Sequence, residues 1–405
     1  MSKKNDDFFV EKKLWSKVKD DLLGCYLKPY VAKILHTYKP LVYVDCFAGK
    51  GKFDDGSPGS PLIALNIFES GLAKTKLDGK AKILASFIDL NYASELEINL
   101  SSYKSGKINI VSGAYEDTIE KILESKQGCN VFLYIDPYGI KALDCTRFDS
   151  FANGRFNTIE LLINMNSFGF IREACNALGT KFRISEQGFF DDLVEYDSTI
   201  LDSTEKSVEA LNRIAGGAYW KDIIIRYKKR EIDGYQAEEQ FSELYCQRLR
   251  KSYKYVLNMP IRIKNNQHPK YRMIHATNHC DGCVLMADNI YNRWELLKDI
   301  QNNGQLPLFQ VTLNNQFVDD QKVTEYVIEH FSQYSEWIPL TEAQALFFVK
   351  NGVMCKTGDI SSILKRLEKE QRLEVKRSPS LTKTKKPSTF MTEGHGQSVL
   401  VKWVN

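Results

Sequence analysis

The chain has 405 residues, of which 43% are hydrophobic and 26% charged, and its formal net charge is +4, as in an ordinary globular protein with two or three domains. The net charge is too small to indicate a nucleic-acid partner by itself, and no apolar run reaches the roughly 18 residues that a membrane-spanning helix requires. Nine scattered cysteines and a polar start without the apolar segment of a signal peptide argue against a disulfide-stabilised secreted domain and predict a cytoplasmic protein with reduced thiols.

Strand-like and helix-like segments alternate regularly through the first 165 residues. Apolar spacing predicts a helix over 8–38, with a break at Pro29 because proline removes a helical hydrogen bond. Near-continuous apolar strands that alternate with helices predict a parallel sheet covered on both faces, a doubly wound α/β core over 40–165. The predicted strands are Leu41–Cys46, Lys82–Ile88, Ile108–Val111, Val131–Ile135 and Thr158–Asn164, and the predicted helices are Pro61–Glu69, Ala93–Ser102, Tyr115–Ser125 and Leu143–Phe151.

Residues 165–300 are predicted to extend and complete this core. The segment 165–235 has mixed charge and helix-like spacing, which predicts a helical insertion. A first domain over 1–310 follows if the sheet is completed by the next three elements, helix Ala237–Ser252, strand Tyr271–Thr277 and helix Cys283–Lys298.

A second domain is predicted over 321–405. Gln, Asn, Gly and Pro dominate 301–320, which indicates a linker. Three helices are predicted at 321–334, 341–350 and 358–370, followed by strands Arg372–Lys376 and Ser398–Val404. This is the order of a winged helix, in which the third helix and the wing contact nucleic acid.

Basic residues are concentrated in the predicted third helix and wing. Glu368, Glu370 and Glu374 dilute this basic patch, so a winged helix that is purely structural or binds protein stays open. The predicted nucleic-acid contacts are Lys365, Arg366, Lys369, Lys383, Lys385 and Lys386.

Three predicted strands end on carboxylates. The first ends on Asp45 and runs into a turn with Gly49 and Gly51, where the missing side chains let the backbone approach a ligand. The second ends on Asp89, which can accept hydrogen bonds from both hydroxyls of a ribose, and the fourth ends on Asp136. Each acid alone could be a turn or cap residue, but three together predict a binding site at the carboxyl ends of the strands.

The glycine turn matches neither common phosphate-binding motif. It runs on to Gly59-Ser60-Pro61 before the next helix begins, whereas a dehydrogenase turn enters its helix directly, and the P-loop pattern is absent. A strand-end acid, loose glycines and a second acid fit S-adenosylmethionine, which has no phosphates to bind.

The segment Asp136-Pro137-Tyr138-Gly139 suits methylation of an exocyclic amine of a base. The carboxylate and a backbone carbonyl fixed by proline can each accept one amine hydrogen, and the tyrosine can stack on an extruded or single-stranded base. These three residues, Asp136, Pro137 and Tyr138, are the predicted catalytic residues. The tyrosine follows Pro137 directly, so this is a shortened form of Asp-Pro-Pro-Tyr.

On three motifs the chain resembles the three-Cys-motif partner proteins. They are Tyr43 to Gly51, Gly59-Ser60-Pro61-Leu62 and Asp136 to Gly139, and the run from Trp15 to Tyr30 resembles the family's opening helix. The order of motifs is more distantly similar to bacterial large-subunit ribosomal RNA adenine methyltransferases. The resemblance implies a class I, Rossmann-like methyltransferase fold and a partner that carries a three-cysteine, radical-SAM-like motif.

The resemblance also assigns residues to S-adenosylmethionine. Asp45, Phe47, Gly49 and Gly51 would line its methionine end, Asp89 would hold the ribose, and Gly113 and Ala114 would lie beside the adenine. Lys17 and Lys28 are possible electrostatic contacts. No metal site is predicted, because the ligand pairs around His275, His279, Cys280 and Cys283 lack the usual separation of a zinc site.

Three functions follow as hypotheses. The first is a methyltransferase that acts on RNA or DNA. The second is a non-catalytic protein that binds S-adenosylmethionine or nothing and regulates the radical-SAM-like partner. The third is a winged-helix regulator with a degenerate first domain. The target base and the oligomeric state do not follow from the sequence.

Overall fold

The computed structural model describes residues 9–12, 14–74, 82–103, 107–183, 204–261, 269, 271–301, 319–394 and 396–404. The chain divides into two compact units, Met1–Asn278 and His279–Asn405. The polar N-terminal start, most of the predicted linker 301–320 and residues 184–203 of the predicted insertion lie outside the described residues.

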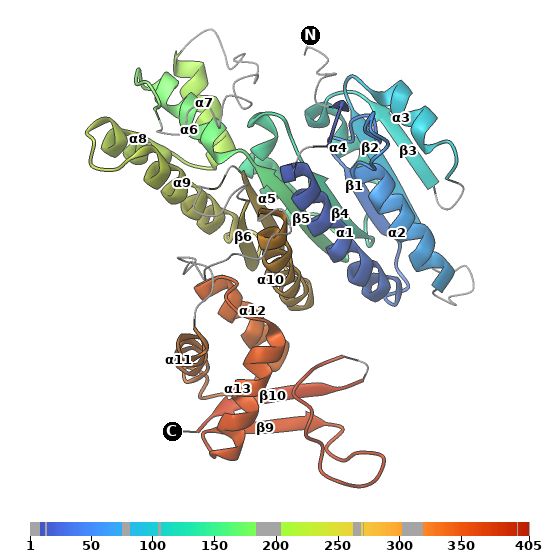
Figure 1. Ribbon diagram of the computed structural model, residues 1–405, viewed down its shortest axis with the longest axis vertical. Helices are drawn as coiled ribbons and strands as arrows, with labels where there is room; N and C mark the ends of the chain where they lie inside the picture. The colour runs from blue at the N-terminus through green and yellow to red at the C-terminus, as the bar shows by residue number, and fades with distance from the viewer. Residues whose placement is uncertain are drawn as a thin grey trace. The chain divides into compact units, whose positions relative to one another are not determined.

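A seven-stranded sheet forms the centre of the first unit (Figure 1). Its order is β3-β2-β1-β4-β5-β7-β6; β1 to β5 are parallel, and β7 runs antiparallel to both β5 and β6. The predicted doubly wound, Rossmann-like core is therefore confirmed. The strands are β1 Leu41–Asp45, β2 Ile83–Asp89, β3 Lys107–Ser112, β4 Asn130–Ile135, β5 Thr158–Met165, β6 Tyr255–Ile261 and β7 Tyr271–Thr277.

The strand order reverses between β1 and β4, which places a switch point there. Asp45 is paired in register with Phe87 of β2 and Tyr134 of β4. Asp89 and Asp136 each follow two residues later on those neighbouring strands. The three strand-end carboxylates thus lie at one edge of the sheet, where doubly wound proteins bind ligands.

Helices cover both faces of this sheet. Helices α1 and α2 pack side by side on one face, as Figure 1 shows in blue. On the other face, the apolar sides of α4, α5, α6, α7, α8 and α9 join β1, β4 and β5 in one buried core. The bounds are α1 Leu14–Leu35, α2 Ser60–Lys74, α3 Ala93–Leu100, α4 Tyr115–Glu124, α5 Cys145–Ala152, α6 Ser167–Ala177, α7 Thr204–Ala215, α8 Trp220–Lys228 and α9 Gly234–Leu249.

The predicted break at Pro29 is wrong, because α1 continues through it to Leu35. Tyr26 and Tyr30, which flank the proline, are buried and stack on each other with ring centroids 5.6 Å apart. The Tyr26 hydroxyl also donates a hydrogen bond to the buried carboxylate of Glu160 on β5. Packing and this bond to the sheet outweigh the hydrogen bond that proline removes.

The second unit begins one element earlier than predicted. Helix α10, Cys280–Gln301, packs against α12 and α13 instead of completing the first domain. The Thr357 hydroxyl at the start of α13 donates to Asp288 of α10 at 2.6 Å, and the Thr357 amide donates at 2.8 Å. The predicted boundary at 310 therefore differs from the observed one at 278.

The rest of this unit has the predicted helices and strands. They are α11 Asp320–Phe331, β8 Ile338–Pro339, α12 Leu340–Asn351, α13 Thr357–Lys369, β9 Leu373–Ser378 and β10 Ser398–Trp403. The short strand β8, which we did not predict, pairs with β10 to make a three-stranded antiparallel sheet. Assignment of this unit as a winged helix stays a prediction. Among the helices of the described residues, none is both long and apolar enough to cross a bilayer.

Candidate functional site

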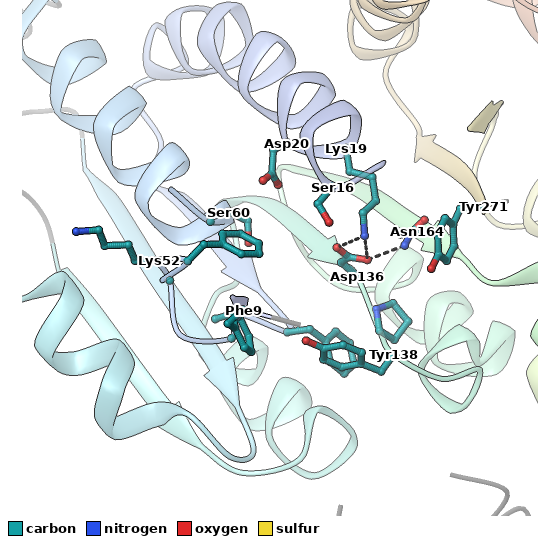
Figure 2. Close-up of a pocket in the computed structure, with 17 residues that line it drawn as sticks. Phe9, Ser16, Lys19, Asp20, Lys52, Ser60, Asp136, Tyr138, Asn164 and Tyr271 are labelled. Carbon is teal, nitrogen blue, oxygen red and sulfur yellow. Dashed lines mark hydrogen bonds and ion pairs between the residues drawn. The ribbon is translucent and has the colours of Figure 1, made fainter. Parts of the chain in front are cut away.

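A pocket opens at the switch point of the first unit (Figure 2). Its walls come from the start of α1, the turn after β1, the start of α2 and the ends of β4 and β5, with Tyr271 from β7. Six of the predicted site residues line it together, Phe47, Gly49, Gly51, Asp136, Pro137 and Tyr138. The other lining residues are Phe9, Ser16, Lys19, Asp20, Ala48, Lys52, Phe53, Gly59, Ser60, Asn164 and Tyr271.

Asp136 is already engaged by side chains of the protein. The Lys19 ammonium donates to both of its carboxylate oxygens, at 2.8 Å to Oδ1 and 2.7 Å to Oδ2. Asn164 Nδ2 donates to Oδ1 at 2.7 Å, and Figure 2 shows this network as dashed lines. A substrate amine can therefore use Asp136 fully only if one of these donors moves away.

Two carboxyl groups beside this network have raised pKa values. Burial raises the pKa of Asp45 from 3.8 to about 7; the Ser60 hydroxyl and the Phe47 amide oppose the shift, and Asp136 and Asp20 add to it. Burial also raises the pKa of Asp20 to about 6, against the attraction of Lys12, whose Nζ lies 2.5 Å from the Asp20 carboxylate. Asp45 does not line the pocket but lies buried beneath it, so its action on a ligand is electrostatic.

The site contains buried acceptors that lack donors. Within the described part of the chain, Asp45 Oδ2 and Asn164 Oδ1 have no hydrogen-bond partner. When all groups are ionised, the three carboxylates of Asp20, Asp45 and Asp136 and the two ammonium groups of Lys12 and Lys19 sum to −1. Of these two acceptors only Asn164 Oδ1 belongs to a residue that lines the pocket, so it can accept a hydrogen bond from a ligand, and the net negative charge favours a cationic ligand.

The glycine turn is covered by the protein's own side chains. Gly49 and Gly51 have φ of +60° and +75°; a Cβ on Gly49 would lie 2.9 Å from the Phe9 ring, and one on Gly51 would lie 2.7 Å from Leu96. Phe9 also packs edge-on against Tyr92, with ring centroids 5.0 Å apart. The close approach that the glycines allow is thus made in part by Phe9, which we did not predict.

We expect Gly49→Ala to lower the free energy of unfolding by about 2–3 kcal/mol, from a strained positive φ and from the clash with Phe9. Gly56→Ala is the matched control, since Gly56 has φ +85° and open space where its Cβ would be. In chemical denaturation, Gly49→Ala should cost more in wild type than in a Phe9→Ala background, where only the backbone strain remains. Equal costs in the two backgrounds would contradict the contact.

Asp89 lies next to the glycine turn, and its carboxylate accepts hydrogen bonds from backbone amides. Its Oδ2 accepts from the Gly49 amide at 2.9 Å, and its Oδ1 accepts from the amides of Asn91 and Tyr92 at 2.8 and 2.7 Å. Gly113 donates to the Asp89 carbonyl at 3.1 Å, and Ala114 precedes α4. Asp89, Gly113 and Ala114 do not line the pocket, and their contacts with ribose and adenine stay predictions.

The predicted nucleic-acid contacts are exposed in the second unit. Lys365, Arg366 and Lys369 lie on α13, and Lys383, Lys385 and Lys386 lie in the loop between β9 and β10.

Two of the four histidines and cysteines weighed above as zinc ligands contact other parts of the protein. His275 is buried and pairs with Glu160 at 3.0 Å, and the Cys283 thiol contacts the Ala345 carbonyl at 3.8 Å. His279, Cys280 and Asp281 bring their ligand atoms within 4.8 Å of one another, which is one ligand short of a four-coordinate zinc site.

The opening helix supplies site residues that the sequence analysis missed. Lys17 and Lys28, which we named as electrostatic contacts, are exposed, whereas Lys19 is buried and reaches Asp136. Ser16 and Lys19 lie on the helix face that also carries Tyr26 and Tyr30. Following this face back from Tyr30 along the predicted helix would have identified Lys19.

Among known proteins, the chain is similar to solved structures but to no family model. No family model matches the chain, and no curated protein matches it. Fourteen chains of solved structures match. Among them is loganic acid methyltransferase with SAH, at 12% identity and a TM-score of 0.32, covering 75% of this chain and 89% of that one. Another is the cyclopropane synthase MmaA2 from Mycobacterium tuberculosis, at 9% identity and a TM-score of 0.25, covering 61% and 81%.

Proposed function

We propose that this chain is an S-adenosylmethionine-dependent methyltransferase that acts on nucleic acid at an exocyclic amine of a base. The observation that carries the proposal is the pocket at the switch point, which joins the glycine turn after β1 to Asp136, Pro137 and Tyr138 after β4. The strand order with an antiparallel β7 between β5 and β6 is that of the class I methyltransferase sheet.

The charges of the site fit this cofactor. S-adenosylmethionine combines a sulfonium, an ammonium and a carboxylate, so its net charge is opposite to the −1 of the five buried and half-buried groups. Asp45 beneath the turn would attract the ammonium, and Lys19, which pairs with Asp136 in this structure, is the buried cation that would bind the cofactor carboxylate. The cofactor supplies an activated methyl group, while the protein must orient the accepting amine and remove its proton.

Tyr138 and Asp136 would hold the accepting base. Tyr138 lines the pocket and is 43% exposed, and its ring would stack on a single-stranded or extruded base. Asp136 and Asn164 Oδ1 would accept the hydrogens of the amine. Fixing the amine in this way positions its lone pair for attack on the methyl carbon.

The basic residues predicted to contact nucleic acid, on α13 and in the loop between β9 and β10, would bind the phosphates of the substrate. Neutralising Lys383, Lys385 and Lys386 should weaken binding of mixed-sequence DNA or RNA and reduce the slope of log affinity against log salt by about 2–3. The full-length variant is compared with one that removes three exposed lysines elsewhere, Lys228→Ala, Lys229→Ala and Lys322→Ala. Equal slopes for the two variants would contradict a phosphate-binding wing.

A non-catalytic regulator of a radical-SAM-like partner is the second candidate. Two observations favour it. Asp136 already accepts hydrogen bonds from Lys19, Asn164 and the Tyr134 hydroxyl, and Phe9 covers the glycine turn. Such a protein would bind S-adenosylmethionine without transferring its methyl group, and would co-purify with a three-cysteine partner.

Labelled-methyl transfer to bulk RNA and to bulk DNA separates the two candidates. The enzyme hypothesis predicts label in one of the two polymers. Saturable cofactor binding without label in either polymer would support the regulator instead.

A further inference from the structure

The Lys19–Asp136 ion pair engages two groups that the proposed reaction needs separately. Lys19 would bind the cofactor carboxylate, and Asp136 would bind the substrate amine. Lys19 comes from α1 and Asp136 from the end of β4, 117 residues later, and their side chains are 8% and 23% exposed. The Lys19 ammonium donates its hydrogen bonds to the carboxylate that would accept hydrogen bonds from a substrate amine. Among the described residues, two lysines line the pocket; Lys52 is exposed and Lys19 is buried.

We propose that binding of the cofactor draws Lys19 from Asp136 onto the cofactor carboxylate and thereby opens Asp136 to the substrate amine. The inference rests on the proposed function and assigns Lys19 as a positioning residue that couples the two ligands. Asn164 stays on Oδ1 of Asp136 and keeps the carboxylate oriented after Lys19 has left.

The exchange is balanced in charge. Lys19 passes from one carboxylate to another, so the number of buried ion pairs is unchanged and no isolated buried ammonium forms. After Lys19 has left, Asp136 stays partly exposed beside Asn164 and can accept a hydrogen bond from the substrate amine. A substrate that arrives before the cofactor meets a filled acceptor, so cofactor binds first and substrate second. Each ligand strengthens the binding of the other, as reciprocity of coupling requires.

The coupling can be measured without the substrate. Two ligands are titrated by calorimetry: S-adenosylhomocysteine, and its decarboxylated analogue, which keeps the adenosine, the thioether and the amino group. The quantity compared is the affinity for S-adenosylhomocysteine divided by that for the analogue. This ratio cancels any effect of a substitution on the shared parts of the ligands, and it isolates the carboxylate contact.

Asp136→Asn releases Lys19 and should raise this ratio at least fivefold. Lys19→Met removes the cation and should lower the ratio at least tenfold, and in that background Asp136→Asn should have no further effect on it. Lys33→Met, which removes an exposed lysine from the same helix, is the control and should leave the ratio unchanged.

An unchanged or lowered ratio in Asp136→Asn would overturn the exchange, as would a Lys19→Met protein that keeps the wild-type ratio. If wild type binds neither ligand, the proposed function itself fails, and this outcome is distinct from binding without the exchange. Far-UV circular dichroism of each variant confirms that the compared proteins are folded.

Discussion

Asp136→Ala is expected to lower the rate of methyl transfer by about 10³-fold while cofactor binding is retained. The carboxylate is the acceptor that would orient the substrate amine and draw off its proton, and general base groups contribute about 10²–10⁴-fold. Because the substitution also frees Lys19, affinity for S-adenosylhomocysteine should not fall. Single-turnover transfer of a labelled methyl group, with cofactor in excess, measures the chemical step directly.

Asn164→Ala is the informative companion to Asp136→Ala. Asn164 touches Asp136 at 2.7 Å but would contribute one amide oxygen to the substrate. We expect a smaller loss of about 10-fold to 10²-fold. If Asp136→Ala transferred methyl groups at the wild-type rate, Asp136 would have no part in the reaction.

Asp45→Asn is expected to lower affinity for S-adenosylmethionine by about 10-fold to 10²-fold and to stabilise the ligand-free protein above pH 7. The buried carboxylate supplies negative charge beneath the turn where the cofactor ammonium would lie. Its pKa is raised from 3.8 to about 7 by burial, so ionisation opposes folding.

The pH dependence of stability follows from this shift. Between about pH 4 and pH 7 the folded protein holds the Asp45 proton and the unfolded chain does not, so the free energy of unfolding falls as the pH rises through this window. The full destabilisation is present above pH 7 and absent below about pH 4. Asp45→Asn should therefore raise the free energy of unfolding by about 1–3 kcal/mol at pH 8 and by much less at pH 4.

Urea denaturation at pH 4, 6 and 8 measures the free energy of unfolding of wild type and of Asp45→Asn. Asp54→Asn, which removes an exposed carboxylate near the same turn, is the control and should shift stability little at any of these pH values. A variant that is less stable than wild type at pH 8 would contradict the burial of an ionised Asp45.

The central sheet could be predicted from the sequence because its strands are nearly uninterrupted apolar runs. The first five strands and the helices between them were predicted with similar bounds. Strand β6 was missed because Pro260 lies within it, and α10 was placed in the wrong unit because its packing against α12 and α13 is a tertiary contact. Helix α1 passes Pro29 for the same kind of reason, since its packing on the sheet outweighs local propensity.

In the candidate site, only the residues at the ends of predicted strands could be predicted from the sequence. Asp45, Asp89 and Asp136 follow apolar runs, and the parallel sheet brings them to one edge. Lys19 and Phe9 reach the site from an N-terminal segment whose position depends on how α1 packs, and no local pattern states which carboxylate a lysine will meet. The hydrogen bonds that backbone amides donate to Asp89 likewise depend on the exact path of two loops.

Calorimetric titration of the wild-type protein with S-adenosylmethionine near pH 7, in two buffers of different ionisation enthalpy, tests the cofactor site most directly. We predict one saturable site per chain, with net proton release, because a cationic ligand lowers the pKa of Asp45 and Asp20 from about 7 and about 6. Absence of saturable heat in both buffers would contradict the account.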